Sequence, residues 1–258
     1  MTEMIDIHCH ILPGIDDGAK TIAVTLDMAK TAVDQGIHHI VATPHHCNGK
    51  YNNVKKDILK YTSVLNEKLT EEAIPLTILP GQETRINGDM VEGLEQGEIL
   101  PINEHTKYVF VEFPSGHIPE YSKQLLFDIQ LKGYKPVIVH PERNRELMEH
   151  PDKLYHMVEK GALSQVTASS LCGKFGKKIQ KFSHQLIETS LTHFIASDAH
   201  NTSTRGFYLK DAYDELHKQH GNEGFYLFRE NPHLMIEGKM VNSLPPERIK
   251  KKSFFGFL

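Results

Sequence analysis

The sequence predicts one α/β domain in which a parallel sheet of seven strands curls into a distorted barrel with helices outside it. Short apolar runs alternate with amphipathic helical patterns along the 258 residues, as in chains of βα units. Seven such units fit into about 200 residues, which favours a closed or nearly closed barrel, one step short of the eight-stranded form. No Gly/Ser-rich linker interrupts the pattern before the C-terminal end, so we expect a single domain.

Each predicted strand is a short apolar run, and the helices lie between the runs. In chain order the strands are Ile5–His8, His39–Thr43, Leu76–Leu79, Tyr108–Glu112, Val137–His140, Leu163–Thr167 and His193–Ser197. The first helical pattern begins at Ile22, repeats apolar residues at i+4, i+7 and i+11, and is followed by Gly36, where a helix C-cap belongs. Further helices are predicted at 54–69, 119–132, 151–160, 177–190 and 207–236, the last packed on the outside of the barrel.

The composition argues against several classes of protein. With 29 basic and 33 acidic side chains the net charge is −4, so we expect no nucleic-acid partner. No apolar run approaches the roughly 18 residues of a membrane-spanning helix. The first residues lack the basic and apolar regions of a signal peptide, and three cysteines are too few for a disulfide framework. We therefore expect a cytoplasmic protein.

The 17 histidines direct attention to the strand ends, because histidine is the commonest metal ligand in proteins. Imidazoles and carboxylates follow nearly every predicted strand: His8, His10, His45, His46, Glu83, Glu112, His140, Glu142, Asp198 and His200. The C-terminal ends of barrel strands converge on one face, and residues two apart on a strand point the same way. Carboxylates gathered there would repel one another without a cation between them, so the pattern predicts a metal site.

These motifs resemble those of the polymerase-and-histidinol-phosphatase (PHP) superfamily of metal-dependent phosphoesterases. They are most similar to those of the bacterial manganese-dependent protein-tyrosine phosphatases of capsule and exopolysaccharide operons. The matching stretches are Ile5–Pro13, Ile15–Gly18, Ala42–His45, Pro80–Glu83, Val111–Pro114, His140–Asn144 and Ser197–Asn201. The resemblance implies a (β/α)7 barrel of the PHP type and a centre that binds up to three metal ions.

The resemblance also implies which residues bind each ion. One ion would take His8, His10, Glu83 and Asp198, a second would share Glu83 and add Glu112 and His140, and the third would take Asp17, His45 and His200. Asp16 competes with Asp17 and His46 competes with His45, although the family pattern favours Asp17 and His45. Imidazole and carboxylate ligands without thiolate suit Mn²⁺, Fe²⁺ or Zn²⁺, and the resemblance favours Mn²⁺.

Charge favours a phosphate substrate. Three divalent ions exceed the charge of the four carboxylates among these ligands, and the excess would balance a phosphomonoester dianion. The ions would polarise the phosphoryl oxygens and activate a water as hydroxide that attacks phosphorus directly. Arg143 and Arg205 follow ligand segments and are predicted to clamp the phosphoryl oxygens. The chain has no Cys-x5-Arg loop of the cysteine phosphatases, and Cys9 is expected to be a small buried residue that points away from the ligands.

The predicted function is a phosphoric monoester hydrolase of the protein-tyrosine-phosphatase type. The resemblance implies that its partner is a bacterial tyrosine kinase and that its activity regulates capsule or exopolysaccharide synthesis. The main alternative is a small-molecule phosphomonoesterase of the same superfamily, acting on a substrate such as histidinol phosphate. A nuclease is disfavoured by the acidic body of the chain, and a non-catalytic metal-bound scaffold is disfavoured because every ligand position is filled.

Residues 246–258 are interpreted as a tail that follows the barrel of residues 1–245. Pro245 and Pro246 mark the break between them, and the basic and aromatic residues of the tail are Arg248, Lys250, Lys251, Lys252, Phe254, Phe255 and Phe257. Such clusters are typical of segments that bind an anionic membrane surface or a protein partner, so the tail could place the protein at the inner membrane face or on its kinase. The alternative is a terminus that frays or packs on the barrel.

Overall fold

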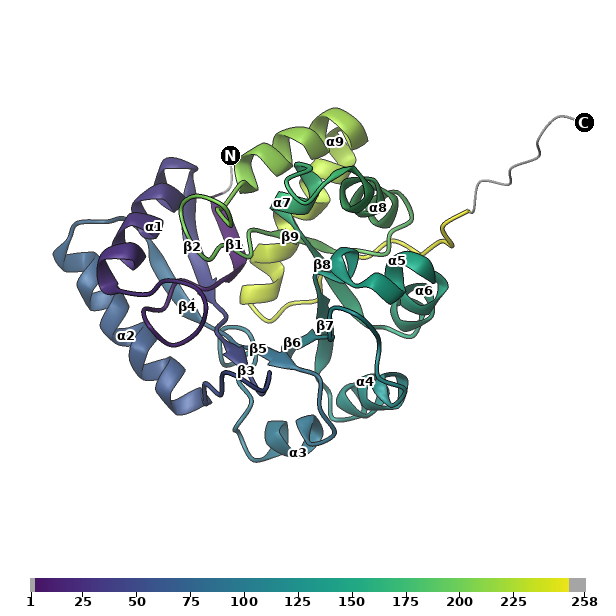
Figure 1. The fold of residues 1–258 in the computed structure, drawn as a ribbon, viewed down its shortest axis with the longest axis horizontal. Helices are drawn as coiled ribbons and strands as arrows, with labels where there is room; N and C mark the ends of the chain where they lie inside the picture. Colours follow the sequence, from purple (N-terminus) through teal and green to yellow (C-terminus); the bar gives the residue numbers. More distant parts are fainter. Residues whose placement is uncertain (1–2, 251–258) are drawn as a thin grey trace, which may run out of the picture.

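The computed structural model describes residues 3–250 as a curved array of parallel strands with helices outside it (Figure 1). Within this part of the chain the strands are β1 (Met4–Cys9), β2 (Ile37–Ala42), β3 (His45–His46), β4 (Thr77–Pro80), β5 (Glu83–Arg85), β6 (Tyr108–Glu112), β7 (Lys135–Val139), β8 (Leu163–Thr167) and β9 (Phe194–Ala196). The helices are α1 (Ile22–Asp34), α2 (Lys55–Glu71), α3 (Met90–Glu95), α4 (Ser122–Leu131), the 3-10 helix η1 (Pro141–Arg143), α5 (Arg145–Glu149), α6 (Asp152–Glu159), α7 (Ala168–Leu171), α8 (Lys177–Glu188) and α9 (Leu209–Ile236).

All seven predicted strands are present, and two of them continue as a second short strand after a break. The hydrogen-bonded order is β1-β2-β4 in one sheet and β3-β5-β6-β7-β8-β9 in the other, with every pair parallel. Beyond β9, Ala199 pairs with Cys9 and brings the last strand back to the first. The prediction of a single α/β domain with a distorted barrel is confirmed, and the distortion is the interruption between the two sheets.

The breaks lie just before two of the predicted metal ligands. Pro44 precedes β3 and has no N–H to donate to a neighbouring strand. Gly81 precedes β5 at a point of close approach, where a Cβ would lie 2.6 Å from Val41 Cγ1. After the breaks the backbones pair again, with His45 opposite Glu83. The strands that follow the breaks therefore place the side chains of His45 and Glu83 next to each other.

A buried carboxylate ties the start of the barrel to its end. Asp6 on β1 accepts hydrogen bonds from the backbone N–H of Ser197 at 2.9 Å and from its hydroxyl at 2.5 Å. Burial raises the pKa of Asp6 to about 6 although the hydrogen bonds from Ser197 oppose it. The backbone N–H of Asp198 donates to the carbonyl of His8 at 2.8 Å. These contacts set the segment after β1 beside the segment after β9.

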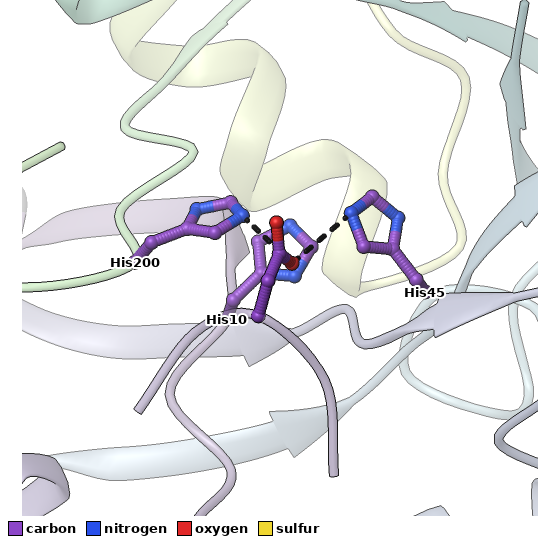
Figure 2. A group of neighbouring side chains, drawn as sticks. His10, His45 and His200 are labelled. Carbon is purple, nitrogen blue, oxygen red and sulfur yellow. Dashed lines mark ion pairs between the residues drawn. The ribbon is translucent and has the colours of Figure 1, made fainter. Parts of the chain in front are cut away.

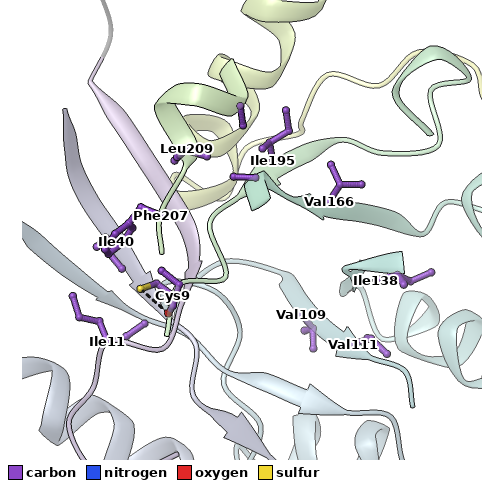
Figure 3. Packing of buried hydrophobic residues seen from close by; sticks show 14 of the residues in the cluster. Cys9, Ile11, Ile40, Val109, Val111, Ile138, Val166, Ile195, Phe207 and Leu209 are labelled. Atoms are coloured by element: carbon purple, nitrogen blue, oxygen red, sulfur yellow. Dashed lines mark hydrogen bonds between the residues drawn. The ribbon is translucent and has the colours of Figure 1, made fainter. Parts of the chain in front are cut away.

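Alternate residues on the strands face two separate cores. On β6, Tyr108 and Phe110 face the barrel interior, whereas Val109 and Val111 pack with the surrounding helices. Figure 3 shows part of the outer core, in which Cys9 lies among aliphatic side chains. This alternation is the burial pattern of a parallel barrel that is covered by helices.

The longer helices agree with the predicted patterns, and only short ones were missed. The first helix ends as expected, because Gly36 follows it with φ of +81°. The short helices α3, α5 and α7 were not predicted, since fewer than two turns carry little periodicity.

Helix α9 corrects the expectation for residues 207–236. It is kinked at Gly221, and beyond the kink Met235 packs into the interior core with Phe194 and Val241. The interior core also contains the first residues of several strands, so this half of α9 closes the amino end of the barrel rather than lying outside it (Figure 1). The opposite, carboxyl end of the barrel is left for the functional site.

The described part of the tail lies against the helices. The backbone N–H of Glu247 donates to Thr189 O at 2.8 Å, and Arg248 forms an ion pair of 2.8 Å with Asp152 and stacks over the Tyr155 ring. The other tail residues singled out above, apart from Lys250, lie outside the described residues: Lys251, Lys252, Phe254, Phe255 and Phe257. Across residues 3–250, no helix has the combination of length and apolar character that crossing a bilayer requires.

Candidate metal centre

The carboxyl ends of the strands bring together all nine side chains that were predicted as metal ligands. Each lies within ion-pair distance of at least one other. Three groups of donor atoms within this cluster are close enough to share an ion: His8, His10 and Asp198; His10, Asp17, His45 and His200; and His45, Glu83 and Glu112. The nine assignments remain predictions.

Glu83 lies at the centre of the cluster. Its Oε2 is 3.4 Å from His8 Nε2, 3.2 Å from His10 Nε2 and 3.0 Å from His45 Nδ1. Its Oε1 is 2.7 Å from His140 Nε2. The carboxylate is fully buried. A carboxylate with each oxygen turned to a different set of imidazoles has the geometry needed to bridge two ions, the role predicted for it.

Asp198 completes the first group of predicted ligands. Its Oδ1 lies 3.5 Å from His8 Nε2 and 3.3 Å from His10 Nε2. The two histidines reach the same carboxylate because they are two residues apart at the end of β1. All three side chains are buried, so an ion held here would be shielded from solvent.

The geometry distinguishes Asp17 from its neighbour Asp16. Asp17 Oδ1 lies 3.4 Å from His45 Nε2 and 3.3 Å from His200 Nε2, and Figure 2 shows His10, His45 and His200 pointing to a common centre. Asp16 turns the other way and holds His10 Nδ1 at 2.6 Å. The arrangement favours Asp17 as a ligand and gives Asp16 the role of orienting His10.

His45 and His46 also separate clearly. His45 faces the cluster, whereas His46 lines a different pocket together with Cys47 and Ile99. Successive residues of an extended strand point to opposite sides, so only one of the two can reach the cluster. The geometry favours His45.

The unpaired atoms of the cluster fit bound cations. Within the described residues, several buried donor atoms of the predicted ligands have no hydrogen-bond partner: His8 Nε2, His10 Nε2, Asp17 Oδ1, His45 Nδ1, Glu83 Oε2 and His200 Nε2. Buried polar atoms are normally paired, and unpaired ones point to an ion or another missing partner. These imidazole nitrogens and carboxylate oxygens face one another, as the ligands of divalent transition-metal ions do.

The pKa shifts within the cluster show how strongly its charged groups interact. Burial alone would lower the pKa of His45, but the carboxylates of Glu83 and Asp17 raise it to about 10. Burial and the charge of Glu83 raise the pKa of Glu112 to about 7, in spite of Arg85. Burial lowers the pKa of His200 to about 4, aided by the charge of His10. His45 and Glu112 therefore hold a proton more strongly than usual, whereas His200 is kept neutral, the form in which an imidazole can bind a cation.

Two predicted ligands hold left-handed backbone conformations. His140 has φ of +37° and Asp198 has φ of +52°, a region that non-glycine residues rarely adopt. Such strain persists only where the surrounding structure imposes it, and it gathers at functional sites. Here it turns both side chains toward the centre of the barrel mouth.

Gly18 shows why the segment after Asp17 needs a glycine. A Cβ at this position would lie 2.0 Å from the carbonyl oxygen of His10 and 2.4 Å from its Cβ. The backbone N–H of Gly18 also donates to Asp16 Oδ1 at 2.8 Å. The loop therefore packs directly on the backbone of a predicted ligand.

A cavity of about 300 Å³ opens beside the cluster. Arg143 and Arg205 line it, and their Nη2 atoms lie 2.5 Å and 3.2 Å from Asp198 Oδ2. Arg85 lines it as well and forms a bidentate pair with Glu112 at 2.9 and 3.0 Å. An apolar wall of Phe113, Val139 and Pro141 completes the lining. The cavity is thus lined by both charged and apolar side chains.

Within the described residues all three cysteines are free, and none takes part in the cluster. Cys9 is fully buried in the outer core, where its Sγ lies 3.4 Å from Ala199 O. Burial raises the pKa of the Cys9 thiol well above its usual value. The expectation of a small buried residue that points away from the ligands is confirmed.

Sequence reasoning missed several residues that support the cluster. Arg85 pairs with Glu112, and Gln165 on β8 accepts a hydrogen bond from His8 Nδ1 at 2.9 Å. Arg85 could have been found, since it lies two residues after Glu83 on the same strand. Gln165 offers a weaker signal, because it is one of three polar residues in the five-residue strand β8.

The comparisons with known proteins agree with this architecture. The family described as "Capsular polysaccharide synthesis, CpsB/CapC" matches residues 4–237. The chain belongs to the CpsB/CapC family. Among curated relatives, tyrosine-protein phosphatase YwqE of Bacillus subtilis is 50% identical over 98% of this chain and 100% of its own length. The putative tyrosine-protein phosphatase CapC of Staphylococcus aureus is 40% identical over 99% of this chain and 100% of its own length. Tyrosine-protein phosphatase CpsB of Streptococcus pneumoniae is 30% identical over 92% of this chain and 100% of its own length.

Solved structures resemble this CpsB/CapC chain at two levels. A chain from the crystal structures of YwqE and CpsB, described as unique metal-dependent tyrosine phosphatases, gives a TM-score of 0.94 at 50% identity, covering 96% of this chain and 100% of its own. A phosphotriesterase homology protein from Escherichia coli gives a TM-score of 0.58 at 12% identity, covering 91% of this chain and 99% of its own. At this identity the likeness supports the fold alone.

Proposed function

We propose that this CpsB/CapC chain is a metal-dependent tyrosine phosphatase. The observation that carries the proposal is the set of unpaired imidazole and carboxylate atoms beside a cavity that two arginines line. Its relatives at 50% and 40% identity, matched over their whole length, are named as a tyrosine-protein phosphatase and a putative tyrosine-protein phosphatase. The cluster is suited to phosphoester hydrolysis, because phosphoryl transfer depends on positioning and charge stabilisation rather than covalent help.

The ligand sets proposed for the three ions are those that the resemblance implies. They are His8, His10, Glu83 and Asp198 for the first, Glu83, Glu112 and His140 for the second, and Asp17, His45 and His200 for the third. The donor groups of the structure differ from these sets in two respects, because they place His45 with Glu83 and Glu112, and His10 with Asp17, His45 and His200. When bound, the ions would polarise the phosphoryl group and lower the pKa of the attacking water. Mn²⁺ is our proposal for the native metal, and the oxygen and nitrogen donors would also accept Fe²⁺ or Zn²⁺.

The chain itself positions the substrate. Arg143 and Arg205 converge on one oxygen of Asp198, so their guanidinium groups stand together in the cavity lining, where they can bind phosphoryl oxygens. The Arg143 guanidinium carbon lies 5.5 Å from the centroid of the Phe175 ring, a cation–π contact. The apolar wall of Phe113, Val139 and Pro141 offers a surface for the phenyl ring of a tyrosine.

The leaving group also favours phosphotyrosine over an alkyl phosphate. A tyrosine phenolate has a pKa near 10, so it departs with less help from a general acid than an alkoxide needs. The apolar residues Phe113, Val139 and Pro141 of the cavity lining suit a phenyl ring better than the polar imidazole and amino groups of histidinol, the competing substrate. We propose further that the protein substrate is a bacterial tyrosine kinase or its targets, and that hydrolysis regulates capsule or exopolysaccharide synthesis.

A direct assay tests these alternatives. Purified protein with Mn²⁺ is incubated with a phosphotyrosine peptide, histidinol phosphate and single-stranded DNA, and phosphate or nucleotide release is measured. We expect the phosphotyrosine peptide to be hydrolysed with the highest kcat/KM. A preference for histidinol phosphate would instead assign a small-molecule phosphatase, and DNA cleavage would assign a nuclease.

Arg143→Lys should lower turnover by about tenfold or more. Lysine keeps the positive charge but loses the planar fork that can hold two phosphoryl oxygens at once. The measurement is kcat and KM for p-nitrophenyl phosphate, with metal content determined on the same sample. A wild-type rate at full metal content would remove Arg143 from the phosphate site.

We propose that residues 246–258 bring the enzyme to an anionic membrane surface or to a membrane-bound kinase. Four basic residues and three phenylalanines in this short segment are the supporting observation. The ion pair of Arg248 with Asp152 would hold the start of the segment at α6. This contact also leaves the packed terminus as the competing interpretation.

Deletion of residues 249–258 retains Arg248 and should leave hydrolysis of p-nitrophenyl phosphate unchanged, since every proposed ligand precedes residue 201. The same deletion should weaken binding to phosphatidylserine vesicles or slow dephosphorylation of the kinase, and the difference should shrink with added salt. Equal vesicle binding and equal kinase dephosphorylation by both proteins would exclude a docking role.

A further inference from the structure

We propose that Gln165 is a positioning residue of the metal centre, whose side-chain oxygen fixes the tautomer of His8. This inference rests on the proposed role of His8 as a metal ligand. Gln165 lies on β8, and neither side chain has exposed surface. Gln165 Oε1 lies 2.9 Å from His8 Nδ1, across the barrel mouth from β1.

The surroundings of Gln165 fix which end of its amide faces His8. Its Nε2 donates to the carbonyl oxygen of Val166 at 2.7 Å. A carbonyl oxygen can only accept, so the NH₂ group must face Val166 and the oxygen must face His8. The reversed amide would place two acceptors against each other at a buried site, which is unfavourable.

The amide oxygen in turn fixes the imidazole. Because Gln165 Oε1 only accepts, His8 Nδ1 must carry the hydrogen, and in the neutral ring the lone pair is then on Nε2. His8 Nε2 lies 3.4 Å from Glu83 Oε2 and 3.5 Å from Asp198 Oδ1 and has no hydrogen-bond partner among the described residues. The lone pair is therefore presented to the place where the first ion would bind.

The three histidines around this position have different supports. Asp16 holds His10 Nδ1 with a carboxylate, and the backbone oxygen of Asp198 holds His200 Nδ1 at 2.9 Å. Gln165 does the same for His8 with a neutral group. A neutral support orients the ring without adding another negative charge to a buried cluster that is already rich in carboxylates.

The backbone of Gln165 supports a second predicted ligand. Its carbonyl accepts a hydrogen bond from the N–H of His140 at 2.8 Å, where His140 holds its left-handed conformation. One residue of β8 thus contacts two segments that carry ligands. Only the side chain is altered by substitution, so variants can separate the effect on His8 from the backbone contact.

The experiment measures ion affinity in the full-length protein. Gln165→Met has similar length but no acceptor for the His8 N–H, and it should weaken Mn²⁺ binding by about 10–100-fold in a chelator competition. Gln165→Glu retains an acceptor for the His8 N–H, as the Asp16 carboxylate does for His10, so its affinity should stay within a few-fold of wild type. At saturating Mn²⁺ the Gln165→Met protein should recover most of its kcat.

Ser164→Ala is the matched control. Ser164 is the buried neighbour on β8, and its hydroxyl donates to Leu191 O at 2.6 Å rather than to a predicted ligand. This variant should lose stability comparable to that of Gln165→Met and keep wild-type Mn²⁺ affinity. Equal affinity of Gln165→Met and wild type would overturn the proposal, as would an equal loss in the Ser164→Ala control.

If Gln165→Met fails to fold, an NMR measurement on the wild-type protein tests the proposal instead. In wild-type protein without metal, ¹⁵N NMR of the His8 ring should show the proton on Nδ1 in the neutral form. A proton on Nε2 would overturn the proposal without any variant. If wild-type protein bound no ion at all, the metal centre itself would be wrong, while the NMR result would still decide the tautomer.

Discussion

Replacement of Glu83 by glutamine should lower turnover of a phosphotyrosine peptide by more than about 100-fold. Loss of a residue that merely supports a metal ligand costs about 10–100-fold in affinity or activity, and Glu83 lies at the centre of the proposed ligand set. Its two oxygens face four imidazoles at distances from 2.7 to 3.4 Å. Glutamine has the same shape but removes the negative charge that would hold two ions together.

The cysteines provide the control for this prediction. Cys9→Ser, Cys47→Ser and Cys172→Ser should each retain substantial turnover, because none of these thiols lies in the cluster. Steady-state kinetics and metal analysis on the same preparations separate the two classes of variant. If a cysteine variant were inactive at normal metal content, the nucleophile would be covalent and the proposed mechanism would be wrong.

Removal of metal by a chelator should abolish activity, and added Mn²⁺ should restore it. The metal-free protein should also melt about 5–10 °C lower, because an ion at about 100 times its Kd contributes about 2.7 kcal/mol to folding and each kcal/mol shifts Tm by about 2–4 °C at this size. Part of this loss reflects the buried carboxylates, which repel one another when no cation separates them.

Elemental analysis and thermal melting of matched samples check this prediction. The purified protein should contain two to three transition-metal ions per chain before treatment, as expected for the proposed centre. Full activity in a sample that contains no stoichiometric metal would contradict the metal-dependent mechanism.

The sequence predicted the strands well because each one combines a short apolar run with polar residues at its end. The run from Tyr108 to Glu112 is both a predicted strand and β6 in the structure. The break between the two sheets could not be predicted, since the close approach that excludes a Cβ at Gly81 involves Val41, a residue from a neighbouring strand. The closure of the barrel by α9 likewise depends on a kink at Gly221 that periodicity does not reveal.

The proposed ligands at strand ends could be predicted from the sequence, whereas the ligand in a loop could not. His8 and His10 follow from spacing alone, whereas Asp17 came only from the resemblance, because its loop has no periodicity. The choice between Asp16 and Asp17 needed coordinates, since both carboxylates reach the cluster from opposite sides. Supporting residues such as Gln165 act through hydrogen bonds across the barrel, which no local pattern records.

The hydrogen bonds between Asp6 and Ser197 have a consequence for synthesis of the protein. These residues are separated by 191 positions, and they join β1 to the segment after β9. Because the ribosome delivers the chain from its amino end, β1 emerges first and has only β2 beside it until Asp198 and His200 leave the exit tunnel. An exposed strand edge with His8 and His10 must therefore be kept from wrong partners throughout translation. A nascent chain that stops before residue 198 holds most of the barrel but cannot complete the proposed ligand group of His8, His10 and Asp198.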